Sequence, residues 1–237
     1  MTGNAGTFFE KVREAMKTIH GMICALIIAV VGLAGIAAPQ TAASQATTPQ
    51  PPSASTGGLT DQDRAALIDQ LVKTKQAFIE SIRGLSDAQW RFKPNPFKWS
   101  VAECADHIIM SEDFFMGNEQ KLMQTPAQSR PSDQAAGQDK ALQGFVADRS
   151  NKFFNPDALA PKGQFATPAE AIAQFTTRRD HSIEYAKTTK DDLRAHFVPT
   201  PRGTLDAYQL LLLMAGHSGR HTAQIQEVKA NAKYPAS

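Results

Sequence analysis

Two histidines at helical spacing are the strongest chemical signal in this sequence. His217 and His221 are four residues apart in a stretch that predicts a helix, so both imidazoles leave the same face, one turn apart. That spacing suits two nitrogen ligands of one metal ion. The pair follows the apolar run Leu210 to Met214, which indicates a helix that is apolar nearly all round and central to the fold. The alternative is that both are core histidines with backbone partners.

Two glycines lie beside the histidine pair. Gly216 precedes His217 and Gly219 stands between the two histidines. Glycine costs about 1 kcal/mol relative to alanine inside a helix. We therefore expect another backbone or a bound species to come close to this part of the helix.

His107 is the candidate for a third ligand. It lies within a second predicted helix, four residues after Glu103 and three after Cys104, on the side expected to pack inward. Three neutral imidazoles from two helices leave one coordination position open, which is typical of catalytic sites where bound water approaches a pKa of about 7. The alternative is a core histidine without a metal. His181 and His196 stand among charged residues and are expected to face solvent.

The side chains around the three histidines narrow the chemistry. The metalloprotease motif of the same spacing needs a glutamate after its first histidine, but Ser218 stands there, so that class loses its general base. Glu103 is either a general base acting from the neighbouring turn or a helix-capping residue, and capping is favoured. Cys104 is either a further ligand or, as we favour, a buried structural cysteine. Arg220 is expected to point to another face, where it binds a carboxylate or stays solvated.

Four long helical segments must position these residues. Helical spacing of apolar residues predicts helices over residues 60–83, 100–123, 167–187 and 204–229. Four helices of roughly 20–25 residues in one chain indicate an all-α fold, a four-helix bundle. The sequence shows no internal repeat and no alternating strand pair with a hairpin turn, so no β-structure is predicted.

Local signals mark where these helices begin and how they are joined. Ser100 and Glu103 form a capping box, and Thr204 is expected to cap the last helix. Residues 85–98 and 188–203 are predicted to be connections without regular structure. The segment 125–166 is irregular, with a weak helix around residues 141–149, and long irregular segments often cover a binding site or form a dimer contact.

The N-terminal part of the chain has the pattern of a secretory signal peptide. An uncharged apolar run over residues 23–38 follows three basic residues and precedes the small residues 41–46. Sixteen residues in a helix span about 24 Å, short of a hydrocarbon core of about 30 Å. We predict a cleavable signal peptide over residues 1–44 and a secreted or periplasmic protein. An uncleaved N-terminal anchor is the alternative.

The mature chain would then begin with a linker. Residues 45–58 contain mostly Pro, Ser, Thr and Gly and are predicted to be disordered. The helical domain is predicted over residues 59–231. No stable membrane span remains after cleavage, and Cys104 remains without Cys24, so the exported protein would form no internal disulfide.

Composition excludes several classes of function. The 237 residues contain 25 Lys and Arg against 23 Asp and Glu, a formal charge of +2, so no basic excess indicates a nucleic-acid partner. Two cysteines cannot form a disulfide framework or a zinc ribbon. A small-molecule substrate of unknown identity is the expected partner.

Two motifs together resemble a known family. The segment from Trp99 to His107 has the pattern W-S-x-x-E-x-x-x-H, and the segment from His217 to Ile225 has the pattern H-x-x-R-H-x-x-Q-I. Paired at this separation, they resemble the DinB-like superfamily over about residues 59–230. The resemblance implies a four-helix bundle that holds a divalent metal, usually zinc or nickel, through three side chains. The matching positions are His107, His217 and His221.

The resemblance also implies a range of activities. Members of the family include transferases and isomerases that use bacillithiol, mycothiol or glutathione, and proteins described as metal-dependent hydrolases. Dimers are common among them, which leaves a homodimer open as a partner. Because low-molecular-weight thiols are made and kept reduced in the cytosol, an exported member favours hydrolysis over thiol transfer.

Three interpretations follow from the sequence. The first is a metal-dependent enzyme, a hydrolase or a thiol transferase, that activates water or a substrate heteroatom at three histidines. The second is a metal-binding module without turnover, which the ion stabilises by binding the folded state. The third is a helical interaction protein whose histidines are ordinary core residues.

Overall fold

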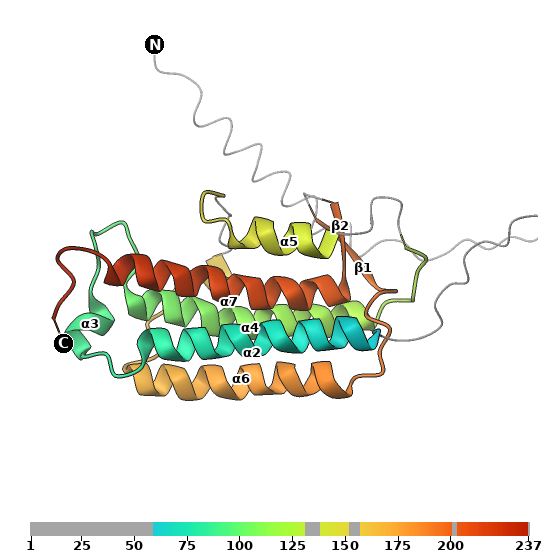
Figure 1. Ribbon diagram of the computed structural model, residues 1–237, viewed down its shortest axis with the longest axis horizontal. Coiled ribbons are helices and arrows are strands. Elements are labelled where there is room, and N and C mark those ends of the chain that lie inside the picture. Colours follow the sequence, from blue (N-terminus) through green and yellow to red (C-terminus); the bar gives the residue numbers. More distant parts are fainter. Residues whose placement is uncertain (1–58, 131–137, 152–156, 201–202, 237) are drawn as a thin grey trace, which may run out of the picture. The chain divides into compact units, whose positions relative to one another are not determined.

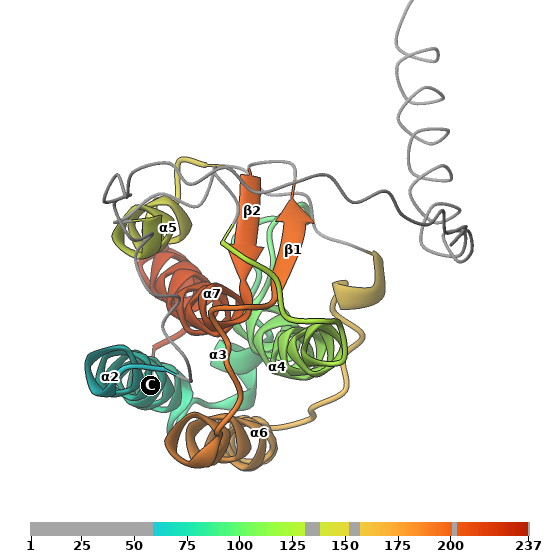
Figure 2. The ribbon, with the colours of Figure 1, turned by 90° about the vertical axis from the view of Figure 1, so that its right-hand side faces the viewer.

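The computed structural model describes residues 59–130, 138–151, 157–200 and 203–236 (Figure 1). Four long helices form its body: α2 (Asp61–Ile82), α4 (Val101–Met123), α6 (Pro168–Thr188) and α7 (Ala207–Lys229). Viewed end on, they form a four-helix bundle in which neighbours follow the order α2, α7, α4, α6 (Figure 2). The predicted four-helix bundle is confirmed.

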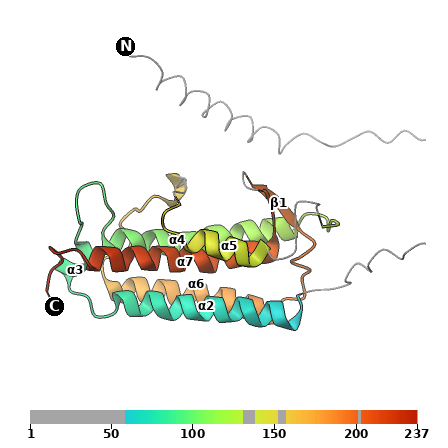
Figure 3. The same cartoon turned by 45° about the horizontal axis from the view of Figure 1, so that its top comes forward.

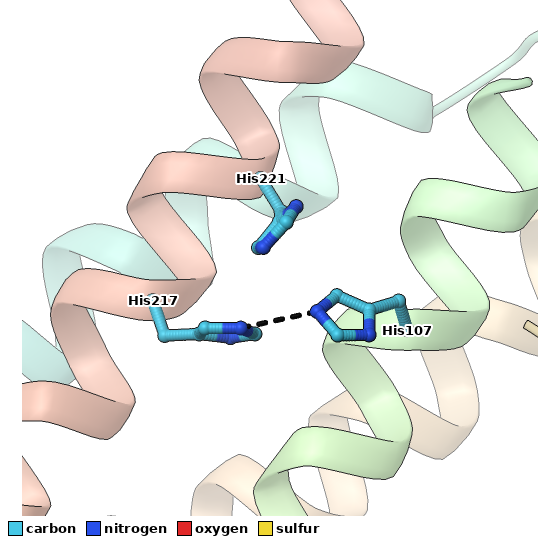
Figure 4. A group of neighbouring side chains, drawn as sticks. All are labelled: His107, His217 and His221. Carbon is cyan, nitrogen blue, oxygen red and sulfur yellow. Dashed lines mark hydrogen bonds between the residues drawn. The ribbon is translucent and has the colours of Figure 1, made fainter. Parts of the chain in front are cut away.

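The direction of the helices decides which of them can share a site. The colours of Figure 1 show that α2 and α7 run one way, while α4 and α6 run the opposite way. The neighbours α4 and α7 are therefore antiparallel. The first third of α4 lies beside the last half of α7, and this brings His107 to the level of His217 and His221 (Figure 4).

Side-chain caps fix where the helices begin. Thr60 caps α2, and Ser100 and Glu103 form the predicted capping box of α4. Thr167 caps α6, with Pro168 in the first turn, where its missing N–H costs nothing. Asp206, and not Thr204, caps α7, so the prediction for that helix was wrong by two residues.

A short hairpin precedes α7, against the prediction of no β-structure. Strands β1 (Phe197–Thr200) and β2 (Gly203–Asp206) pair antiparallel, with Phe197 opposite Asp206 and Thr200 opposite Gly203. Four residues are too few for an alternating pattern to stand out, and the two prolines in this stretch weaken the strand signal further. Thr204 lies in β2, which is why it cannot cap the helix.

Two connections contain helical turns. The link 85–98 includes α3 (Asp87–Arg91), and Ser86 and Gln89 form a second capping box at the start of this helix. In the long connection between α4 and α6, the expected weak helix is α5 (Gln138–Ala147), followed by the single turn η1 (Asp157–Leu159). Figure 3 shows α5 along the outside of α7, and the contacts of η1 are with α4. The segment from Gln138 to Asn151 and from Asp157 to Gly163, here called the covering segment, therefore lies on the two helices with the histidines.

The interior divides into two apolar clusters that meet along the bundle. One contains Leu67, Leu71 and the apolar start of α7, and the other surrounds Trp90, Phe78 and Phe175. Trp90, Phe78, Phe175, Leu67 and Leu71 are among the largest side chains that are fully buried. Burial of this kind, at roughly 25 cal/mol per Å² of apolar surface, is the main force that holds the helices together.

The predicted signal peptide (1–44) and linker (45–58) lie outside the described residues. Within the part of the chain that is described, no helix combines the length and apolar character needed to cross a bilayer.

Candidate metal centre

Three histidines from two helices converge between α4 and α7. His107 comes from α4, and His217 and His221 come from successive turns of α7 (Figure 4). One nitrogen of each ring lies within 4.8 Å of the corresponding nitrogen of the other two. His107 is buried, and the other two are partly exposed. Among the described residues, no other group of three or more His, Cys, Asp or Glu side chains comes together in this way.

Hydrogen bonds at Nδ1 of His107 and of His221 leave Nε2 of each ring unprotonated, and Nε2 of His107 lies within hydrogen-bond distance of Nε2 of His217 (Figure 4). The Nδ1 of His107 lies 2.8 Å from the Leu159 carbonyl oxygen. Since a carbonyl only accepts, this Nδ1 carries the proton and Nε2 keeps its lone pair. The Nδ1 of His221 lies 2.9 Å from Gln224 Oε1, which has the same consequence. Metal-binding histidines in proteins are oriented by outer contacts of this type.

The surroundings keep all three imidazoles neutral. Burial lowers the pKa of His107, and burial followed by the charge of His107 lowers the pKa of His221 to about 3. Burial and then the neighbouring His221 and His107 lower the pKa of His217 well below its usual value. Since a metal ion binds the neutral imidazole, the ligands need not lose a proton at neutral pH.

The distances fit a single ion between the rings. The Nε2 atoms of His107 and His217 lie 3.1 Å apart. Two nitrogens bound at 2.0–2.1 Å to one tetrahedral ion are about 3.3 Å apart. The Nδ1 of His217 is buried and has no hydrogen-bond partner among the described residues. The donor set is three imidazoles, which suits zinc, nickel and similar ions rather than calcium or magnesium.

Aromatic side chains enclose the histidines. The centroid of the Trp99 ring lies 4.9 Å from that of His107 and 5.9 Å from that of His221, on which it stacks at an interplanar angle of 29°. The Phe115 ring contacts His217 edge-on at 5.5 Å. An apolar lining of this kind limits water at the site and strengthens electrostatic interactions within it.

Arg220 has a different role from the one predicted. It is buried, and its guanidinium donates to the carbonyl oxygens of Val146, Asp148 and Asn151. It therefore does not stay solvated, and through these carbonyls it fastens the covering segment to α7. The reason is that α5 packs along the outer face of α7, which the sequence left open.

The close approach predicted at the two glycines is found at one of them. A Cβ at Gly216 would lie 3.1 Å from the Val146 side chain of α5, whereas a Cβ at Gly219 would meet Thr74 at an ordinary 3.4 Å. At Gly216 it is a side chain, rather than a backbone, that comes close. Glycine at position 216 lets α5 lie against α7.

Asp106, beside His107, holds the other end of the covering segment. Its Oδ2 accepts from the backbone N–H groups of Lys162 and Gly163, at 2.5 and 2.7 Å, and its Oδ1 accepts from the Gln164 side chain. Gly163 has a φ of +69°, a conformation that other residues rarely adopt. These bonds keep Leu159 where its carbonyl meets His107. No local pattern indicates this role, because two of the three partners are backbone N–H groups and all three lie more than 50 residues away in the sequence.

A buried ion pair braces the bundle beside the site. Arg179 of α6 is fully buried and donates two hydrogen bonds to Glu112 of α4, at 2.6 and 2.8 Å. It also donates to Ser218, which lies between the two histidines of α7, and to Thr74 and the Leu71 carbonyl of α2. One guanidinium thus ties all four helices together. Arg179 stands between Arg178 and Asp180 in the sequence, and no local pattern there indicates that its side chain is buried.

The remaining candidates fall outside the histidine cluster. The Glu103 carboxylate accepts from the Ser100 N–H and from Lys93, which gives it the favoured capping role. Cys104 is buried in an apolar cluster, and burial raises the pKa of its thiol to about 12, as expected of a structural cysteine. His181 is exposed, as predicted. His196 is buried, against the prediction, because its backbone carbonyl binds the first N–H of α7.

The family model of the DinB superfamily matches residues 38–225, well over half of the chain. The chain belongs to the DinB superfamily. The match begins ahead of residue 59, where the sequence placed the start of the domain.

A solved structure supports the same fold. The protein is similar to YfiT from Bacillus subtilis, described as a probable metal-dependent hydrolase with an unusual four-helix bundle topology. The two are 14% identical, and the TM-score is 0.51 over 78% of this chain and 94% of that one. At this identity the likeness concerns the fold alone. No curated protein matches the chain.

Proposed function

We propose that this DinB-superfamily protein binds one divalent transition-metal ion through His107, His217 and His221 and acts as a metal-dependent hydrolase. The observation that carries the proposal is the convergence of three neutral imidazoles, two of them with their outer nitrogens engaged by acceptors. Three ligands leave a position open in a tetrahedral site, and a metal there would lower the pKa of bound water toward about 7. The three-nitrogen donor set favours zinc or nickel.

The residues around the site would position and shield the reaction. Trp99 and Phe115 line the rings, and the covering segment fixes the orientation of His107. Both oxygens of Glu103 are engaged elsewhere, so we assign it no role as a general base. The name given to YfiT agrees with hydrolysis, and so does the export that we propose from the N-terminal sequence.

Activity with and without thiols tests the proposal. The metal-loaded protein would be assayed on a panel of carboxylic esters, amides and phosphate esters, and on electrophiles in the presence of a low-molecular-weight thiol. Hydrolysis that is lost on chelation and in His221→Ala, but kept in the exposed control His181→Ala, is the expected result. Turnover that requires the thiol would instead make the protein a transferase, and bound metal without turnover would make it a binding module.

A further inference from the structure

Arg149 connects the covering segment to the turn of α7 that follows His221. It lies two residues after α5 and donates two hydrogen bonds to the carboxylate of Glu227, at 2.6 and 2.7 Å. Its third donor, Nη1, lies 3.3 Å from Gln224 Oε1. The same oxygen is 2.9 Å from Nδ1 of His221. Arg149, Gln224 and His221 therefore form a chain of contacts that ends at a histidine of the candidate metal site.

The chemistry of these three groups allows one arrangement of protons. A guanidinium only donates, so the Gln224 amide must present its oxygen to Arg149, because a flipped amide would place its NH₂ group against another donor. An amide oxygen only accepts, so the His221 Nδ1 that faces it must carry the proton. The lone pair of His221 then lies on Nε2, on the other side of the ring.

We infer that Arg149 is a positioning residue, which orients the Gln224 amide and so holds His221 in the tautomer that presents Nε2 to a metal ion. The inference deepens the proposed function and rests on it for the metal. The covering segment would then set the tautomer of two histidines: Arg149 acts on His221 through Gln224, and the Leu159 carbonyl acts directly on His107. Arg220, which binds three carbonyls around this point, holds Arg149 in place.

The direction in which metal affinity changes when Arg149 is replaced distinguishes a positioning role from a purely electrostatic one. A cation near the site repels a bound metal ion, so removal of Arg149 as a mere charge would strengthen metal binding. Removal of Arg149 as the group that orients Gln224 would weaken it, since the loss of an outer contact of a ligand typically costs 10–100-fold in metal affinity. The two roles predict opposite directions.

The test measures the dissociation constant for zinc by competition with a chromophoric chelator, on the full chain. Arg149→Leu is expected to bind zinc roughly 10-fold more weakly than the unmodified protein or worse. The matched control is Glu227→Gln, which removes the ion pair of Arg149 at the protein surface but leaves Gln224 in place, and its affinity should stay within about 3-fold. Unchanged or tighter binding in Arg149→Leu would overturn the inference.

A second background makes the test independent of general destabilisation. In Gln224→Glu both ends of the side chain are acceptors, so no amide remains to be oriented. Adding Arg149→Leu to Gln224→Glu should then weaken zinc binding by less than about 3-fold. An equal loss in both backgrounds would show that Arg149 acts on the fold instead, and would also overturn the inference.

The tautomer can be observed without any metal. Nitrogen-15 NMR of the histidine side chains in the metal-free chain should show His221 protonated at Nδ1, and a mixture of tautomers in Arg149→Leu. If the unmodified chain binds no zinc but shows this change of tautomer, the proposed function fails and the positioning role stands. If the chain binds zinc and His221 has the same tautomer in both proteins, only the positioning role fails.

Discussion

The buried pair of Arg179 and Glu112 makes the sharpest prediction about stability. Both side chains are excluded from solvent, at 0% and 1% exposure, and the pair is bidentate. Arg179→Met would leave the Glu112 carboxylate buried, accepting from the Ser218 hydroxyl. Breaking a buried ion pair by removing one partner costs about 3–5 kcal/mol, because an uncompensated charge stays behind.

Urea unfolding measures this cost directly. With a dependence on urea of about 2 kcal/mol per molar, a loss of about 4 kcal/mol lowers the unfolding midpoint by about 2 M. The double variant Arg179→Met with Glu112→Leu should recover most of the loss, since replacing both members of a buried pair by apolar residues is often neutral. Ser218 would keep a partner there, because its hydroxyl also donates to the Met214 carbonyl.

Two results would refute this reasoning. If Arg179→Met lowers the free energy of unfolding by less than about 1 kcal/mol, Glu112 is not a stranded charge. If the double variant is as unstable as the single one, the loss comes from the hydrogen bonds that Arg179 makes to α2 and not from the ion pair.

Three further predictions concern protons, caps and close packing. Burial lowers the pKa of His221 to about 3 in the folded metal-free chain. Between about pH 3 and 6.5 the unfolded chain therefore binds a proton at His221 that the folded chain does not. The free energy of unfolding then falls as the pH falls through this range. His221→Gln should make that fall less steep by up to about 1.4 kcal/mol per pH unit, measured by urea unfolding at several pH values with a chelator present, and an unchanged slope would contradict the pKa. Glu103→Ala should lower the free energy of unfolding by about 0.5–1 kcal/mol, because the cap of α4 is lost, and should leave the amount of bound metal unchanged. A loss of bound metal in this variant would show that Glu103 belongs to the metal site. Gly117→Ala, with open space around its new Cβ, should raise the free energy of unfolding by up to about 1 kcal/mol, measured as a higher thermal midpoint. Gly216→Ala should raise it less, because its Cβ would lie 3.1 Å from the Val146 side chain. Equal increases in the two variants would show that α5 does not pack closely against α7 at this point.

The bundle could be predicted because its signals are local. Ser100 and Glu103 form the predicted capping box, and Thr60 and Thr167 cap the helices that were predicted to start at these residues. Apolar residues recur at helical spacing within each helix. The hairpin before α7 was missed, since its strands are four residues long. The wrong cap at Thr204 follows from the same miss.

The three histidines could be predicted, but their supports could not. His217 and His221 show their shared face through a spacing of four, and His107 is a candidate both from its place within a second predicted helix and from the paired motifs. The groups that orient them lie far away in sequence: Leu159 is 52 residues from His107, and Arg149 is 75 residues from Gln224. No local pattern encodes such contacts, because they join residues far apart in sequence and the group that faces His107 is a backbone carbonyl, which any residue could supply. The burial of Arg179 and Arg220 also depends on groups distant in sequence, since Arg179 contacts Glu112 and Arg220 contacts the carbonyls of the covering segment.

The metal content of the purified protein tests the central claim most directly. Elemental analysis would be made on the chain purified without chelator and without a polyhistidine tag, then repeated after reconstitution with zinc or nickel. We predict close to one equivalent of metal per chain, lost in His217→Ala and kept in the exposed control His181→Ala. No bound metal after reconstitution, or metal that persists in His217→Ala, would contradict the account.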